Sequence, residues 1–180
     1  MRKKIFLNAT QFKFDESYLP ILIHGVQGAG ASLLTVSLIA QLYSNGSKIL
    51  FFSGYEMAKD EFISQVENID SSRITFVKTD READLIKEIA NIKNLDERVI
   101  LIKNVELLSH EVFTIIEKLS KLVISGNIEK CLFKADLLRF PFKTSILFSP
   151  LFDKNLLNLH KYGGYMWGRK EGYIRVNSRT

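Results

Sequence analysis

The sequence contains a single cysteine, Cys131, and no long hydrophobic run. One cysteine excludes an intramolecular disulfide and offers no thiolate cluster for a metal. None of the apolar runs reaches the roughly 18 residues that a membrane-spanning helix needs. The basic start, Met1 to Asn8, is interrupted by polar residues before a signal-peptide core develops. We therefore expect a cytoplasmic protein with no transmembrane segment.

Common catalytic patterns are also missing. There is no G-x-S-x-G elbow or Ser-His-Asp arrangement, and His110 and His160 lack metal-ligand spacing. The composition is ordinary for a globular protein, with 46% hydrophobic and 25% charged residues. At 180 residues the chain is long enough for one sizeable core. We predict a single domain over 1–180, with its core at about 19–150.

The net charge of +5 is unevenly distributed along the chain. Residues 1–10 carry +3 and residues 161–180 carry +4, which leaves −2 for the rest. Basic ends suit an acidic partner such as nucleic acid, a membrane surface or a neighbouring subunit. Solvated termini are the simpler explanation of the same pattern.

Three glycines, Gly25, Gly28 and Gly30, fall within six residues between an apolar run and a long apolar helix pattern. Strand, glycine loop and helix start follow each other in this order in phosphate-binding loops. Glycine allows close backbone approach there, so that backbone N–H groups converge on phosphate. The alternative is a tight turn between strand and helix that holds no ligand.

The phosphate-loop motif G-x-x-x-x-G-K-[ST] is matched with one substitution. Gly25 and Gly30 have the required spacing, and Ser32 supplies the hydroxyl, but Ala31 replaces the lysine. That lysine normally places a positive charge on the β- and γ-phosphates. The backbone cradle is therefore retained and its side-chain charge is lost.

Alternating strand and helix patterns predict a three-layer α/β fold, with a mostly parallel sheet and helices on both faces. A helix over 109–124, capped by Ser109, is expected to end at Gly126. A short edge strand at 2–8 and a C-terminal β-hairpin within about 157–177 complete the prediction. The core strands are expected at 19–24, 48–53, 73–78, 99–102 and 144–148, and the helices at about 31–43, 59–68, 80–94, 109–124 and 127–138.

Ligands of parallel sheets bind at the carboxyl ends of the strands. Four features follow predicted strands directly: the glycine loop, Glu56, Lys103 and Ser149. If the sheet is parallel, all four share one edge. This edge is the predicted functional site.

The order of these elements resembles the RecA-like ATPases, closest to the KaiC/RadA-type branch, over roughly residues 19–177. The stretch F-F-S-G-Y-E-M-A-K-D-E-F is similar to that branch's second strand, which ends in an acidic pair. The resemblance implies that Glu56 occupies the position of the glutamate that polarises the attacking water, with Tyr55 in place of the first acidic residue. The segment G-Y-I-R-V resembles the closing hairpin, from which Arg169, Lys170 and Arg175 would reach a neighbouring subunit's nucleotide or a nucleic acid.

The metal-holding strand departs from the family pattern. In P-loop ATPases an apolar strand ends in an aspartate that holds Mg²⁺, whereas here Lys103 follows 99–102, and Asn104 and Glu106 are out of register. Both defining charges are therefore absent, since the loop lysine is Ala31. Phosphoryl transfer depends mainly on such charges, so these losses argue against ordinary hydrolysis of Mg-ATP.

Two hypotheses for Lys103 follow. In the first, the Lys103 ammonium contacts the phosphates directly, and the site binds ATP or another nucleotide without Mg²⁺. The residues of this site would be Gly25, Gly28, Gly30, Ala31, Ser32 and Lys103. Alternatively, Lys103 pairs with Glu56 or another carboxylate at this edge, and the site is empty.

The resemblance favours a pseudo-ATPase, a non-hydrolysing structural or regulatory subunit in a homo- or hetero-oligomer with RecA-like subunits. An active or weakly active ATPase, with Glu56 as base and Lys103 as phosphate clamp, is the first alternative. The second is a nucleic-acid-binding accessory protein, in which aromatic residues of the C-terminal hairpin stack on bases and Arg169, Lys170 and Arg175 follow the phosphates.

Overall fold

One sheet runs through the computed structural model, which describes residues 14–25, 31–53, 57–66, 68–78, 82–92, 94–148, 164–166 and 172–176. Its eight strands lie in the order β3-β2-β4-β5-β1-β6-β8-β7. The first six of these positions are parallel neighbours, while β8 is antiparallel to β6 and β7 to β8. The strands are β1 (Ile21–Gly25), β2 (Lys48–Ser53), β3 (Ile74–Lys78), β4 (Arg98–Lys103), β5 (Leu122–Gly126), β6 (Thr144–Phe148), β7 (Gly164–Met166) and β8 (Gly172–Val176).

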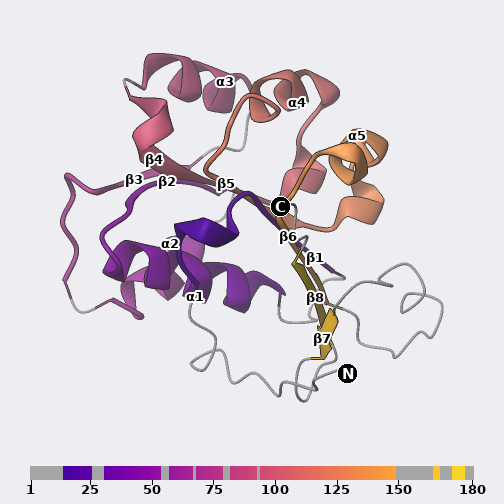
Figure 1. The fold of residues 1–180 in the computed structure, drawn as a ribbon. Helices are drawn as coiled ribbons and strands as arrows, with labels where there is room; N and C mark the ends of the chain where they lie inside the picture. Colours follow the sequence, from indigo (N-terminus) through magenta and orange to yellow (C-terminus); the bar gives the residue numbers. More distant parts are fainter. Residues whose placement is uncertain are drawn as a thin grey trace.

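Helices cover both faces of the parallel part of the sheet (Figure 1). One face carries α1 and α2, and the other carries α3, α4 and α5. The described helices are α1 (Ala31–Ser44), α2 (Met57–Ile63), α3 (Glu82–Asn91), α4 (His110–Ile116) and α5 (Lys134–Arg139). The predicted α/β architecture with a layer of helices on each side is confirmed.

The direction in which the chain crosses the sheet decides the face of each helix. From β1 to β3 it moves toward one edge with α1 and α2 on one face, and from β3 to β6 it returns with α3, α4 and α5 on the other. Parallel strands are joined by right-handed crossovers, so a reversal of direction requires a change of face. The order of the strands therefore accounts for the two layers of helices.

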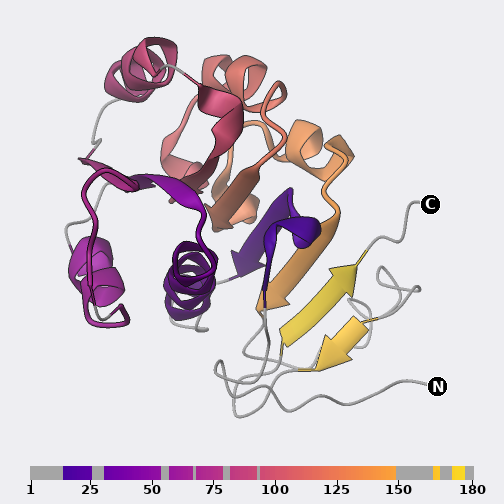
Figure 2. The same ribbon diagram turned by 60° about the vertical axis from the view of Figure 1, so that its left-hand side comes forward.

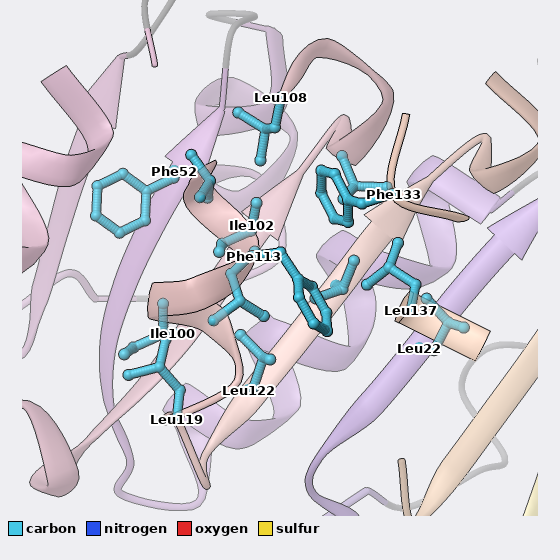
Figure 3. Packing of buried hydrophobic residues seen from close by; sticks show 14 of the residues in the cluster. Leu22, Phe52, Ile100, Ile102, Leu108, Phe113, Leu119, Leu122, Phe133 and Leu137 are labelled. Atoms are coloured by element: carbon cyan, nitrogen blue, oxygen red, sulfur yellow. The ribbon is translucent and has the colours of Figure 1, made fainter. Parts of the chain in front are cut away.

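Buried apolar side chains line both faces of the central strands, because successive residues of a strand point to opposite sides. Figure 3 shows the cluster beneath α4 and α5, in which Phe113 and Phe133 approach side chains of the sheet. Their ring centroids are 5.5 Å apart. The strand residues of this cluster include Leu22, Phe52, Ile100, Ile102 and Leu122, and those of the opposite cluster include Ile23, Phe51, Leu101 and Val123.

The prediction of one helix over 109–124 is wrong. Ser109 does cap the helix, accepting a hydrogen bond from the Glu111 N–H, but α4 ends at Ile116. Residues 122–126 form β5, which is inserted between β4 and β1. Apolar residues continue at helical spacing between α4 and β5, so the periodicity of the sequence does not indicate where the helix ends. Burial of β5 on both faces favours its β-branched residues, Val123 and Ile124, in a strand.

Of the other predicted boundaries, some are confirmed and some are wrong. Strands β2 and β6 have the predicted bounds, and Gly46, with φ of 104°, follows the end of α1. The single helix predicted over 127–138 is instead a 3-10 helix, η4 (Ile128–Lys130), followed by α5. Helix α2 ends at Ile63, short of the predicted residue 68.

Beyond β6, the sheet continues into the antiparallel pair β8 and β7 (Figure 2). This pair falls within the predicted hairpin segment, and residues 167–171 between the two strands lie outside the described residues. The strand predicted at 2–8 also lies outside them.

The loops after β4 and β5 are locked together at Gly126. Glu106, in the 3-10 helix η3 (Val105–Leu107), accepts a hydrogen bond of 2.9 Å from the Asn127 N–H. Gly126 has φ of +154°, and a Cβ there would lie 2.1 Å from Glu106 Oε2 and 2.8 Å from the Val105 nitrogen. A side chain at this position therefore meets both the carboxylate and the backbone of the neighbouring loop.

We predict that Gly126→Ala destabilises the protein more than Gly46→Ala. Gly46 also has a positive φ, of +104°, but nothing lies within 4 Å of its added Cβ, so this control carries the backbone cost alone, about 1–2 kcal/mol. Gly126→Ala adds displacement of the Glu106 carboxylate. Urea unfolding of both variants measures the difference, and equal losses would contradict the predicted packing at Gly126.

Candidate functional site

The carboxyl ends of four strands meet at one edge of the sheet, and the chain leaves them toward opposite faces. Strands β1 and β2 continue into α1 and α2 on one face, while β4 and β5 lead to α4 and α5 on the other. Because β4 and β5 lie between β2 and β1, they are flanked by two topological switch points. Open α/β sheets bind ligands at such points, so the ends of β4 and β5 are the favoured place for a site.

Three polar residues are level with one another at this edge. Lys103, the last residue of β4, pairs with Ser125 of β5. Ser53, the last residue of β2, follows the Phe52–Ile102 pair and is therefore level with Lys103 on its other side. Neighbouring strands are about 4.8 Å apart, so the three residues form a compact row.

All three members of this row lie on the face covered by α1 and α2. Side chains two residues earlier in each strand, Phe51, Leu101 and Val123, belong to the core cluster beneath these helices. Since strand residues alternate between faces, Ser53, Lys103 and Ser125 share that side. The chain leaves β4 and β5 toward the other side, so helices that follow these two strands do not cover the row.

The first turn of α1 is fastened to Ser125 by a buried hydrogen bond. Thr35 Oγ1 lies 2.8 Å from Ser125 Oγ and 2.7 Å from the carbonyl oxygen of Ala31. A threonine hydroxyl has one proton and a carbonyl oxygen only accepts, so the Thr35 proton goes to Ala31 and the Ser125 proton to Thr35. Both hydroxyls are thereby satisfied, and the start of α1 is fixed beside the strand that adjoins Lys103.

Lys103 is partly buried, and its charge is weakly compensated. Burial lowers the pKa of Lys103 from its usual value, and the carboxylate of Glu61 on α2 acts in the opposite direction. Among the described residues no ion pair within 4.0 Å links Lys103 to a carboxylate. A partly desolvated ammonium with only a distant counter-charge is suited to binding an anion.

The next residue, Asn104, turns the chain away from the row. It has left-handed backbone angles (φ 67°, ψ 52°), which asparagine tolerates better than most residues. The turn leads into η3, whose Glu106 bonds to Asn127 as described above. Glu106 therefore joins two loops, and its carboxylate is not part of the row formed by Ser53, Lys103 and Ser125.

The structure brings part of the predicted site together. Gly25 ends β1, Ala31 and Ser32 begin α1, and Lys103 ends the parallel strand β4, so these four lie toward the same edge. Ser32 is exposed, whereas Ala31 is partly buried. Gly28, Gly30, Glu56 and Ser149 lie outside the described residues.

Of the three predicted basic residues of the C-terminal segment, the structure describes only Arg175, which is not near Lys103. Arg175 in β8 pairs with Ser145, the second residue of β6, on the amino-terminal half of that strand. Its backbone is therefore distant from the carboxyl edge of the parallel strands. Arg169 and Lys170 lie outside the described residues.

Sequence reasoning missed three residues of this edge: Thr35, Glu61 and Ser125. Thr35 and Ser125 are 90 positions apart, and the prediction placed Thr35 in a helix and Ser125 just after the end of another, so nothing in the sequence pointed to their contact. For Ser125 the missing information was the strand β5 itself. Glu61 precedes the buried Phe62 in an amphipathic pattern, where a carboxylate normally indicates a solvated face.

The described residues contain no group of three or more His, Cys, Asp or Glu side chains that could hold a metal ion. Among their helices, none is both long enough and apolar enough to cross a membrane. No protein-family model matches the chain, and neither does any curated protein. The arrangement around Lys103 is therefore the main guide to function.

We predict that Lys103→Met stabilises the protein at neutral pH, by about 0.5–2 kcal/mol. Burial depresses the folded-state pKa of Lys103, so the charged lysine costs stability at every pH below that pKa. The cost disappears as the pH rises through the unfolded-state pKa of about 10.4. The gain from Lys103→Met should accordingly shrink as the pH rises above the folded-state pKa and be lost above about pH 10.4.

Chemical unfolding across this pH range provides the measurement. Lys48→Met is the control, because Lys48 is about half exposed and bonds to Glu97 at 2.9 Å, so its removal should give little or no gain. A loss of stability in Lys103→Met at neutral pH would show that the ammonium is well compensated and would contradict the prediction.

Proposed function

We propose that the chain is a catalytically degenerate RecA-like P-loop domain that binds a nucleotide through its phosphates without a metal ion. It acts as a non-hydrolysing structural or regulatory subunit. The observation that carries this proposal is Lys103: a partly buried cation at the end of β4, level with Ser53 and Ser125 and without a direct ion pair among the described residues.

The described residues fit a metal-free polyphosphate better than a polyphosphate that carries Mg²⁺. A lysine stands where the RecA-like resemblance calls for an aspartate that holds Mg²⁺, and an ammonium repels a divalent cation. The same ammonium neutralises phosphate charge directly, as the missing loop lysine would. The glycine-rich sequence before α1 supplies backbone N–H donors in such loops, and the amino end of a helix favours negative charge.

This arrangement favours binding over turnover. Removing one preorganised electrostatic group typically costs about 10²–10³ in rate, and here both the loop lysine and the metal anchor are replaced. Glu56 would still be available as a base, but a base alone does not stabilise the charge that develops on the transferred phosphoryl group. Nucleotide binding without hydrolysis is the outcome that these substitutions support.

The role as a subunit rests on the resemblance. RecA-like domains commonly assemble with the nucleotide at the boundary between subunits, and a domain that binds without hydrolysing would hold such a boundary in one state. We therefore propose a homo- or hetero-oligomer with RecA-like subunits in which this chain contributes a static nucleotide site.

We predict that the purified protein binds ATP equally well with Mg²⁺ and with EDTA, and that Lys103→Met abolishes or strongly weakens this binding. Isothermal titration calorimetry in the two buffers tests the prediction, with Lys48→Met as a control that removes the same charge at the opposite, amino-terminal end of β2. Binding that requires Mg²⁺ would overturn the metal-free site. The absence of heat in both buffers would overturn nucleotide binding altogether.

A further inference from the structure

One carboxylate near Lys103 has no part in the function proposed above. Glu61 lies on α2, the helix that follows β2 at the carboxyl edge of the sheet. Its neighbour Phe62 is fully buried in the core cluster beneath α1, which fixes α2 on the same face as Lys103. Glu61 is itself partly buried.

The Glu61 side chain is held in an unusual state for a carboxylate. Its Oε2 atom is buried and makes no hydrogen bond. A buried carboxylate oxygen without a donor is unfavourable unless a nearby cation compensates its charge. Lys103 is such a cation, because β4 adjoins β2 and Lys103 points toward the α1 and α2 face.

The two charges act on each other through space. The Glu61 carboxylate raises the pKa of Lys103 against the effect of burial. The described side chains form no ion pair within 4.0 Å that joins them, so the Lys103 ammonium is not occupied by a direct contact with Glu61. An ammonium without a direct ion pair and an opposing charge that acts on it are therefore present together.

We propose that Glu61 is the resident counter-charge of Lys103 and limits the negative charge that the site accepts. This inference rests on the proposed function, in which Lys103 receives a phosphate. An incoming phosphate is attracted by the ammonium and repelled by Glu61, and the repulsion grows with the charge of the ligand. Glu61 thus weakens the binding of triphosphates more than that of diphosphates, and weakens the binding of monophosphates least.

Glu61→Gln tests this by removing the charge while keeping the shape of the side chain. Affinities for AMP, ADP and ATP are measured calorimetrically in EDTA at neutral pH. We expect the variant to bind ATP about two- to fivefold more tightly than the wild type, the size of a partly screened charge interaction, with a smaller gain for ADP and the smallest for AMP. Unchanged or weakened affinity, or an equal gain for all three nucleotides, would overturn the proposal.

Asp60→Asn is the matched control. Asp60 precedes Glu61 on the same helix and is exposed, so its removal changes the net charge equally but from a solvated position. It should change the three affinities little. An effect equal to that of Glu61→Gln would mean that overall charge, and not the position of Glu61, governs binding.

A second readout separates this inference from the proposed function. Titration of the ¹⁵N-labelled lysine ammonium groups by NMR, with Lys103 assigned by its loss in Lys103→Met, reports the pKa of Lys103 without any nucleotide. Glu61→Gln should lower that pKa further, whereas Asp60→Asn should not. An unchanged pKa in Glu61→Gln would overturn the counter-charge. If neither protein binds a nucleotide but the pKa falls, the proposed function and the selection among phosphates fail, and the counter-charge stands.

Discussion

Burial of the parallel strands on both faces is the constraint on which the rest of the molecule depends. Strands β2, β4 and β5 have apolar side chains toward both layers of helices, so polar groups are largely confined to the strand ends. Right-handed crossovers then direct the chain to opposite faces at neighbouring ends. The row of Ser53, Lys103 and Ser125 lies where these two conditions meet, and the possible chemistry of this fold is concentrated there.

At that edge the protein keeps a cation in an environment that does not favour it. Lys103 is partly desolvated, and its counter-charge, Glu61, acts from a distance. Elsewhere, described lysines that pair with carboxylates are in direct contact with them, as Lys121 is with Glu16 at 2.7 Å. A charge that is retained at a cost to stability is more readily explained by binding than by folding. This contrast, more than the glycine loop alone, supports an anion as the ligand.

Much of the fold could be predicted because its signals are local. The apolar run of β2 and the apolar helix α1 each depend on neighbouring residues, and both were predicted. β5 was missed because its identity as a strand comes from burial between β4 and β1, which the spacing of apolar residues does not record. Lys103 could be placed at the carboxyl edge of the sheet because it follows an apolar strand, but the contact of Ser125 with Thr35 depends on β5 and could not be predicted. Glu61 was missed because a single carboxylate on an amphipathic helix looks the same whether its charge faces solvent or a lysine.

Two successive residues at the end of β5 make close contacts on different sides of the strand. Ser125 bonds to Thr35 of α1, and Gly126 is covered by Glu106, which also bonds to Asn127. Neither residue has room to move without its partner, because one contact is fully buried and the other leaves no space for even a methyl group. The start of α1 is therefore attached, through neighbouring residues of β5, to the loops that contain η3 and η4. The end of this one strand thus carries contacts to both layers of helices, one through the Ser125 side chain and one through the backbone of Gly126 and Asn127.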